Sequence, residues 1–223
     1  TWSLYSQIAE VGIKRVVLTS SIAAVGHGVG LVDRWPISED MGSTPTDLYS
    51  LTKHTQEVTA RLFAETHNIR TIALRPPAFM PQLSPQAGIA MLGPYSPVED
   101  MVSAHVAAVE VFAGVRSPMR DLELFEAFFT TNALPFTGAD ESFMDTPGSV
   151  NLALASKYWP HCTEWLKANG FESGWCPAVY DLSKARDVLG WMPRVDFGVW
   201  FAENVTAAAE VDIPEIDADG DDA

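Results

Sequence analysis

The sequence predicts an α/β protein with a partial doubly wound parallel sheet and a smaller C-terminal lobe. Residues 13–21 and 68–77 are short runs rich in β-branched residues, a composition typical of buried parallel strands. A helix predicted at about 47–67 lies between them, so the order is strand, helix, strand. The first strand ends in Ser20 and Ser21, at the edge where open α/β sheets bind their ligands.

Two more helices are expected after the second strand. The first lies at about 97–115, and its apolar residues are expected to cover the sheet. These residues are Met101, Val102, Val106, Ala107 and Val109. The second is a short helix with Ser183 as its N-cap and Gly190 as its C-terminal stop.

The most informative feature of the sequence is Tyr49 followed four residues later by Lys53 on the predicted helix. Residues four apart lie on one helix face, so the Lys53 ammonium is expected to lower the pKa of the Tyr49 phenol from about 10. Such a phenol can act as a general acid or base near neutral pH. The pair alone also fits an exposed helix without a catalytic role, and the flanking strands favour the catalytic interpretation.

A family resemblance rests on the order of these motifs. A strand ending in Thr19-Ser20-Ser21, a Tyr-x-x-x-Lys helix and a strand ending in Leu-Arg-Pro at 74–76 resemble the extended short-chain dehydrogenase/reductases, also called the NAD-dependent epimerase/dehydratase family. Smaller matches extend the resemblance from about residue 1 to residue 200. They lie at 12–17, 36–40, 98–105 and 181–193. The resemblance implies a Rossmann-like fold with NAD or NADP as cofactor.

The resemblance also implies catalytic roles. Tyr49 would exchange a proton with the substrate oxygen while hydride moves between the substrate carbon and the nicotinamide. Lys53 would lower the pKa of Tyr49 and bond the nicotinamide ribose. Ser21 matches the catalytic serine of the family and would donate a hydrogen bond to the substrate oxygen.

Three further residues are candidate cofactor contacts. Ser20 is the neighbour of the candidate catalytic serine. Pro76 and Pro77 stand where the family passes its backbone beside the nicotinamide ring. The two prolines also fit simple termination of the strand, because proline cannot donate to a ladder.

A glycine-rich turn for the cofactor pyrophosphate is missing from the sequence. In the family it opens the first βαβ unit, where backbone amides and a helix N-terminus hold the phosphates. Residues 1–10 instead match the helix just before the fifth strand, so the first strands of the sheet are expected to be absent. The glycines at 26–30 do not replace the turn, because Trp35 and Pro36 continue a loop there. We interpret them as a wall of the active-site cleft.

Four segments are expected along the chain. Residues 1–82 would form the second half of a Rossmann-like NAD(P)-binding domain, and residues 83–119 a linking segment with its helix. Residues 120–205 would form the substrate-side lobe. Residues 206–223 would form an acidic, disordered tail. Aromatic residues at 125–129 and at Trp159, Trp165 and Trp175 are expected to form the interior of the lobe.

Composition excludes several classes of partner. The net charge of −15 argues against nucleic acid and anionic membranes, which both attract basic surfaces. The sequence shows no apolar run of about 18 residues and no signal peptide, which favours a cytoplasmic protein.

Cys162 and Cys176 are expected to be free thiols. With His161 they lack a fourth ligand at usable spacing, so no metal site is predicted.

The substrate is expected to be a small hydroxy or carbonyl compound such as a free sugar or uronate. Relatives that act on nucleotide sugars usually place an Asn where Ala78 stands and an Arg near 93–95, where this chain has Gly-Pro-Tyr. A diphosphate needs such donors. The interval from Arg75 to Asp100 is short, as in the uronate-dehydrogenase-like branch.

Two other functions stay open. A nucleotide-sugar epimerase or dehydratase uses the same Tyr/Lys pair but returns the hydride to its substrate. A truncated, non-catalytic fragment or pseudoenzyme would act as a binding module. In every case the expected partner is a small molecule, and a homodimer is a candidate assembly.

Overall fold

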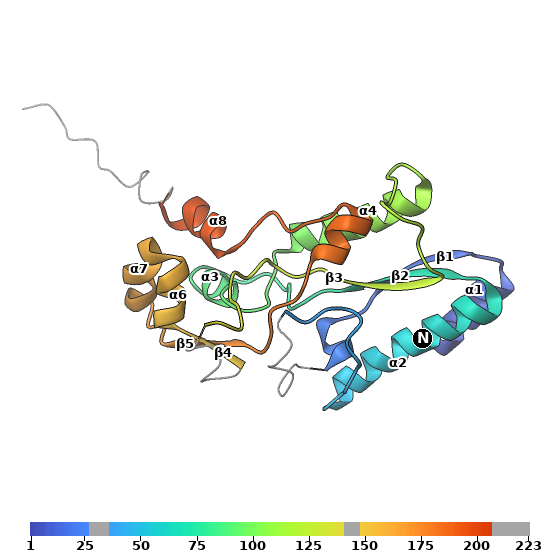
Figure 1. Cartoon of the computed structure of the whole chain (residues 1–223), viewed down its shortest axis with the longest axis horizontal. Coiled ribbons are helices and arrows are strands. Elements are labelled where there is room, and N and C mark those ends of the chain that lie inside the picture. Colours follow the sequence, from blue (N-terminus) through green and yellow to red (C-terminus); the bar gives the residue numbers. More distant parts are fainter. Residues whose placement is uncertain (27–35, 141–147, 207–223) are drawn as a thin grey trace, which may run out of the picture.

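A three-stranded parallel sheet forms the centre of the computed structural model, which describes residues 1–26, 36–140 and 148–206. The strands are β1 (Arg15–Thr19), β2 (Arg70–Arg75) and β3 (Phe125–Phe129), in the order β1-β2-β3. Helices α1 (Trp2–Glu10) and α2 (Leu48–His67) lie on one face, and α4 (Val98–Ala113) lies on the other (Figure 1). The α/β fold class predicted from the sequence is therefore confirmed.

Local sequence explains where α2 begins and ends. The Asp47 carboxylate accepts the Ser50 amide at 2.8 Å, and the Ser50 hydroxyl accepts the Asp47 amide at 3.1 Å, which is a reciprocal capping box. The helix ends at Asn68, whose φ of 53° is left-handed. Between these caps, α2 packs Phe63 against Tyr5 of α1, with ring centroids 5.6 Å apart.

Helix α4 covers the sheet with a different face from the one that the sequence suggested. Its buried apolar residues are Met101, Ala104, Ala107, Ala108 and Val111. Val102, Val106 and Val109 are each about half exposed, so these three of the five expected residues do not cover the sheet. The helix is apolar on two sides, and the small alanines form the side that approaches the strands closely.

The segment 125–129 does not lie in the C-terminal lobe, where its aromatic residues were expected. It forms β3, which pairs in parallel with β2 from Thr71↔Phe125 to Arg75↔Phe129. All five of its residues are buried. A run of buried apolar residues has no alternation that distinguishes a sheet strand from a lobe interior, so only the pairing decides its place.

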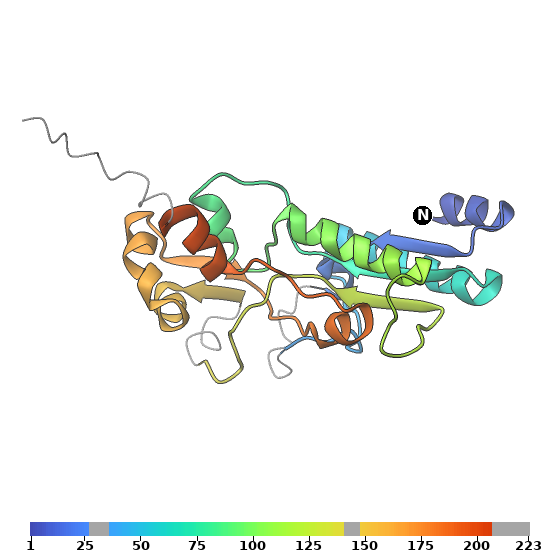
Figure 2. The same cartoon turned by 90° about the horizontal axis from the view of Figure 1, so that it is seen from above.

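The C-terminal lobe lies beyond the carboxyl ends of the strands, which point toward it (Figure 2). It contains the antiparallel pair β4 (Gly148–Asn151) and β5 (Ser173–Cys176). Its helices are α3 (Gln86–Ala90), α6 (Leu152–Tyr158), η2 (Pro160–Cys162), α7 (Thr163–Ala168), α8 (Phe197–Phe201) and η4 (Ala202–Thr206).

Aromatic side chains fill the lobe, as the sequence predicts for two of three tryptophans. Trp159 is buried and Trp165 is partly buried in one apolar cluster, and both rings lie near Phe197. Trp175 is 57% exposed and is not part of this interior. It stands in the short strand β5, where alternate side chains point outward.

The short helix η3 (Ala185–Leu189) returns the chain to the sheet, where Ala185, Val188 and Leu189 join the cluster under α4. Gly190 ends it with a left-handed φ of 61°, as predicted. Ser183 is not its cap. The Asp181 carboxylate accepts both the amide of Ser183, at 2.8 Å, and its hydroxyl, at 2.5 Å, because a carboxylate can accept both at once.

Several predictions concern residues outside the described ranges or features that the described residues lack. The glycines at 27–30 and the acidic tail beyond residue 206 lie outside them. Across residues 1–26, 36–140 and 148–206, no helix is long and apolar enough to span a membrane, and no cluster of three or more metal-binding side chains occurs. Cys162 and Cys176 are buried free thiols, and burial raises their pKa values to about 11 and about 12.

Candidate active site

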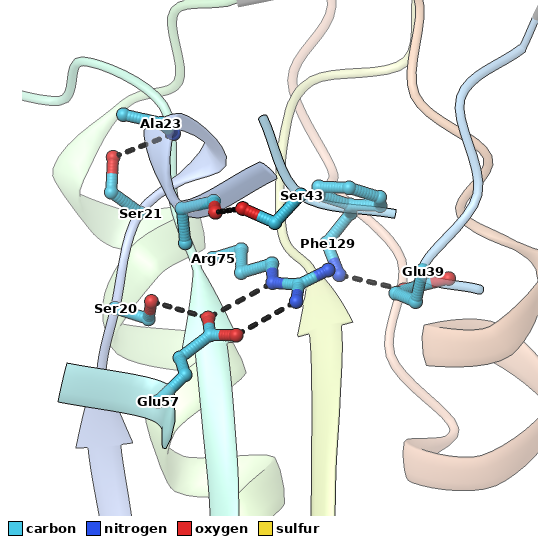
Figure 3. Close-up of polar contacts among 9 residues, drawn as sticks. Ser20, Ser21, Ala23, Glu39, Ser43, Glu57, Arg75 and Phe129 are labelled. Carbon is cyan, nitrogen blue, oxygen red and sulfur yellow. Dashed lines mark hydrogen bonds and ion pairs between the residues drawn. The ribbon is translucent and has the colours of Figure 1, made fainter. Parts of the chain in front are cut away.

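The carboxyl end of β1 continues into a tight turn that keeps pairing with β2. The Ser20 amide donates to the Leu74 carbonyl at 2.7 Å, and the Ile22 amide donates to the Pro76 carbonyl at 3.0 Å. Ser21 then caps the short helix η1 (Ile22–Val25), because its hydroxyl oxygen accepts the Ala23 amide at 3.1 Å (Figure 3). This bond uses a lone pair of the oxygen and leaves the hydroxyl hydrogen available to donate.

Helix α2 attaches to the same strand end through Lys53. Its ammonium donates to the Thr19 carbonyl at 3.2 Å and lies 5.9 Å from the centroid of the Tyr49 ring. Tyr49 stands one turn earlier on α2, and the side chain is 55% exposed. Thr19 also bonds His105 of α4, with 2.8 Å between the hydroxyl and Nε2. The strand end is therefore tied to helices on both faces of the sheet.

Ser20 takes part in a buried network that the sequence did not reveal. Its hydroxyl donates to Glu57 Oε1 at 2.5 Å (Figure 3). Arg75, the last residue of β2, donates to both oxygens of the same carboxylate, at 3.0 and 2.7 Å. Ser20 is only 2% exposed, and its hydroxyl is directed into the protein. Its contact with a cofactor stays a prediction.

Sequence reasoning could have found Glu57 from its position. It follows Lys53 by four residues, so it lies on the same face of α2 as the Tyr/Lys pair. Arg75 is a charged residue that follows the apolar run Ile72-Ala73-Leu74 of β2 and is buried like it. A buried charge needs a partner, but the sequence does not say which one, because the two residues are far apart along the chain.

The residues after β2 form the next part of the site. Pro76 and Pro77 are both buried, and Pro76 contributes only its carbonyl, which accepts the Ile22 amide. Ala78 forms a short parallel bridge with Tyr95, and its carbonyl accepts the Ser96 amide at 3.0 Å. The two positions that the family resemblance connects with nucleotide binding, Ala78 and 93–95, are therefore neighbours here.

Glu39 covers the outer edge of β3 beside this network. Its carboxylate accepts the Phe129 amide at 2.8 Å (Figure 3). Burial raises the pKa of Glu39 above its usual value, although this amide, Lys184 and Arg75 act in the opposite direction. Glu39 and Arg75 both line a polar cavity of about 410 Å³. Glu39 lies in the match at 36–40, for which the sequence predicted no role.

The described residues fit the nicotinamide half of a dinucleotide better than its phosphates. Lys53 is partly exposed and its ammonium has three donors, of which one bonds Thr19. It can therefore also bond a ribose hydroxyl. Tyr49 presents an exposed phenol on the same helix. Across the described residues, no glycine-rich turn leads from a strand into a helix in the way that pyrophosphate sites require.

Comparison with known proteins shows similarity of fold. No family model matches the chain, and no curated protein does. Among solved structures, a mutated uronate dehydrogenase is 18% identical with a TM-score of 0.55, over 98% of this chain and 57% of the other. The UDP-N-acetylglucosamine 4-epimerase from Bacillus cereus is 15% identical with a TM-score of 0.59, over 91% and 66%.

A third structure is that of the UDP-glucuronic acid 4-epimerase from Bacillus cereus in complex with NAD. It is 16% identical with a TM-score of 0.56, over 88% of this chain and 61% of the other. The chain thus spans less than two thirds of the length of each of these three proteins. At such identities the likeness concerns architecture alone, and that architecture is the Rossmann-like fold of dehydrogenases and epimerases.

Proposed function

We propose that this chain carries the catalytic residues of an NAD(P)-dependent oxidoreductase that acts on a small hydroxy or carbonyl compound, such as a free sugar or uronate. The observation that carries the proposal is the attachment of Lys53 to the Thr19 carbonyl, two residues before Ser21, with Tyr49 one turn away on the same helix. The fold shared with dehydrogenases and epimerases supports it.

Each residue has a defined task in this proposal. The bound NAD(P) supplies or accepts the hydride. Tyr49 gives or takes the proton on the substrate oxygen, so that charge does not accumulate there. Ser21 donates its hydroxyl hydrogen to the same oxygen. Lys53 orients the ribose and holds positive charge beside the Tyr49 ring.

The surroundings of Ala78 favour a small substrate. Ala78 offers no side-chain donor, and the hydroxyl of its neighbour Tyr95 already donates to the Met80 carbonyl at 3.1 Å. A sugar diphosphate needs charge-assisted donors, which these side chains do not supply. A free sugar or uronate has no diphosphate and makes no such demand.

The replacement Tyr49→Phe tests the catalytic role. It removes only the phenol oxygen, so cofactor binding should persist while kcat falls by roughly 10²- to 10⁴-fold. Tyr158→Phe makes the same chemical change in the lobe, where the hydroxyl bonds Asp140, and should leave the kcat of the folded protein unchanged. If Tyr49→Phe keeps kcat within a few-fold of the parent, Tyr49 has no place in the mechanism.

A nucleotide-sugar epimerase or dehydratase is the second candidate, because neighbours of this fold include epimerases of UDP-sugars. Calorimetric titration of the parent with UDP- and dTDP-sugars separates the two. We expect no tight binding of nucleotide sugars, and micromolar affinity would favour the epimerase.

Homodimerisation stays a prediction of the sequence.

The non-catalytic module is the third candidate, and we expect these 223 residues alone to bind NADH weakly. Each missing charge-assisted bond to the pyrophosphate would cost about 1.5–3 kcal/mol, so two or three of them amount to several orders of magnitude in affinity. Fluorescence titration of the 223 residues with NADH measures the affinity. Low-micromolar binding with normal turnover by the 223 residues would contradict this prediction.

A further inference from the structure

One face of α2 changes from open to buried along three successive turns. Tyr49, Lys53 and Glu57 are spaced by four residues, so they form a stripe along the helix. The exposed fraction is 55% for Tyr49 and 6% for Glu57, and Lys53 is intermediate. The stripe that carries the proposed proton-transfer pair therefore ends in a buried carboxylate.

Glu57 connects three elements of the fold. It belongs to α2, it accepts the Ser20 hydroxyl at the end of β1, and it accepts two bonds from Arg75 at the end of β2. The side chains of the Glu57–Arg75 pair are each only 8% exposed. Figure 3 shows the carboxylate between the serine and the guanidinium, with every partner directed toward it.

Such a pair is poor evidence for a purely stabilising role. Removing two charges from water costs about as much as their attraction returns, and apolar side chains of similar volume often stabilise a protein as well or better. An apolar pair, however, would not fix the orientation of a neighbouring polar group. The bidentate Arg75 contact fixes the plane of the carboxylate, and the carboxylate in turn fixes the Ser20 hydroxyl.

The charges also specify the register of the helix. If α2 slid by four residues, about 6 Å along its axis, the ammonium of Lys53 would take the place of the Glu57 carboxylate and face Arg75. Like charges in a buried position repel strongly. In the observed register, two consecutive turns of α2 contact two consecutive residues at the end of β1. Lys53 donates to the Thr19 carbonyl, and Glu57 accepts the Ser20 hydroxyl.

We propose that Glu57 is a positioning residue, which holds α2 against the ends of β1 and β2 and so sets Tyr49 and Lys53 in register with Ser21. This inference rests on the proposed function of the site. It assigns Ser20 and Arg75 to the same task. Glu57 and Arg75 are both buried, so each would act through the groups that it positions.

The test compares three forms of the site in the protein encoded by the whole gene. Glu57→Gln weakens the network and leaves Arg75 without its counter-ion. The double variant Glu57→Leu with Arg75→Met replaces the ion pair by apolar side chains, which should restore the melting temperature. Ser20→Ala removes only the serine contact and leaves the ion pair intact. Steady-state kcat, the dissociation constant of the cofactor and the melting temperature are measured for each.

A positioning role predicts that the loss of kcat does not follow the loss of stability. All three forms should lose about 10- to 100-fold in kcat, including the double variant with its restored melting temperature, while the cofactor dissociation constant changes little. Asp140→Asn is the matched control, because it breaks a buried carboxylate contact in the lobe and should lower stability without changing the kcat of the folded protein. Recovery of kcat together with stability in the double variant would overturn the proposal.

Hydrogen exchange gives a readout that does not depend on turnover. In Glu57→Gln and in the double variant, the amides of Ile22 and Ala24 should exchange about tenfold faster or more, and that of Val150 in the lobe should be unchanged. Unchanged exchange at Ile22 and Ala24 would also overturn the proposal. A parent without NAD(P)-dependent turnover would overturn the proposed function instead, and exchange would still decide whether Glu57 holds the Ser21 segment.

Discussion

The region around the sheet buries more charged side chains than the C-terminal lobe, where Asp140 is the buried charge among the described residues. Buried charges in and around the sheet include Glu57, Arg75, Asp100 and Glu126, and each takes part in an ion pair or accepts backbone amides. The core cluster of the lobe consists of apolar and aromatic side chains. An apolar cluster stabilises without fixing the direction of any atom, whereas a buried charge network fixes directions. The candidate site lies beside the network.

The largest effect on stability is expected in the lobe. Phe197 is fully buried, and its ring centroid lies 5.1 Å from that of Trp159. Phe197→Ala should lower the free energy of unfolding by about 3–5 kcal/mol, because it removes a large apolar side chain and leaves a cavity. Denaturant unfolding measures this loss.

The same variant tests the comparison between the two regions. At a temperature where Phe197→Ala is folded, its kcat should equal that of the parent. Leu83→Ala is the control, because Leu83 is 85% exposed and its truncation should cost little. A fall in the kcat of folded Phe197→Ala would show that the lobe core, and not only the network, positions the catalytic groups.

An intermediate effect is expected from acid. Burial alone would raise the pKa of Asp140, but Lys157, the Thr137 amide and the Tyr158 hydroxyl together lower it from 3.8 to about 2. A carboxylate with a lowered pKa in the folded state adds stability that is present above pH 3.8 and is lost as the pH falls through about 2. The shift corresponds to about 2 kcal/mol.

Unfolding measured from pH 5 to pH 2 checks this prediction. Asp140→Asn should flatten the dependence on pH in this window by about 2 kcal/mol. Asp187→Asn is the control, because the Arg186–Asp187 pair lies on the surface, where ion pairs contribute little. If both variants change the pH dependence equally, the contacts of Asp140 are not its source.

The smallest effect is expected on the outer face of α4. Val102 is 58% exposed, so Val102→Ala should change the free energy of unfolding by no more than about 0.5 kcal/mol. Met101, the preceding residue, is 3% exposed, and Met101→Ala should cost about 2–5 kcal/mol. Thermal unfolding of the two variants distinguishes the faces, and equal losses would mean that the outer face is also packed against another surface.

Local sequence predicted the parts of the molecule that depend on neighbours along the chain. The runs at 13–21 and 68–77 contain β1 and β2, and the expected helix at 47–67 agrees with α2. Gly190 was recognised as a helix stop because a left-handed residue there favours glycine. The Tyr49 and Lys53 pair was found in the same way, since helical spacing alone puts the two side chains on one face.

The sequence by itself thus determined the strands and helices around the site, and the residue types that make proton transfer a reasonable proposal. Only the tertiary structure decided that 125–129 joins the sheet, that Trp175 lies outside the lobe core, and that Glu57 pairs with Arg75 and Ser20. The physical reason is the separation along the sequence of the residues that interact. Helix and strand periodicities are set by residues a few positions apart, whereas burial and ion pairing depend on segments that meet only when the chain is folded.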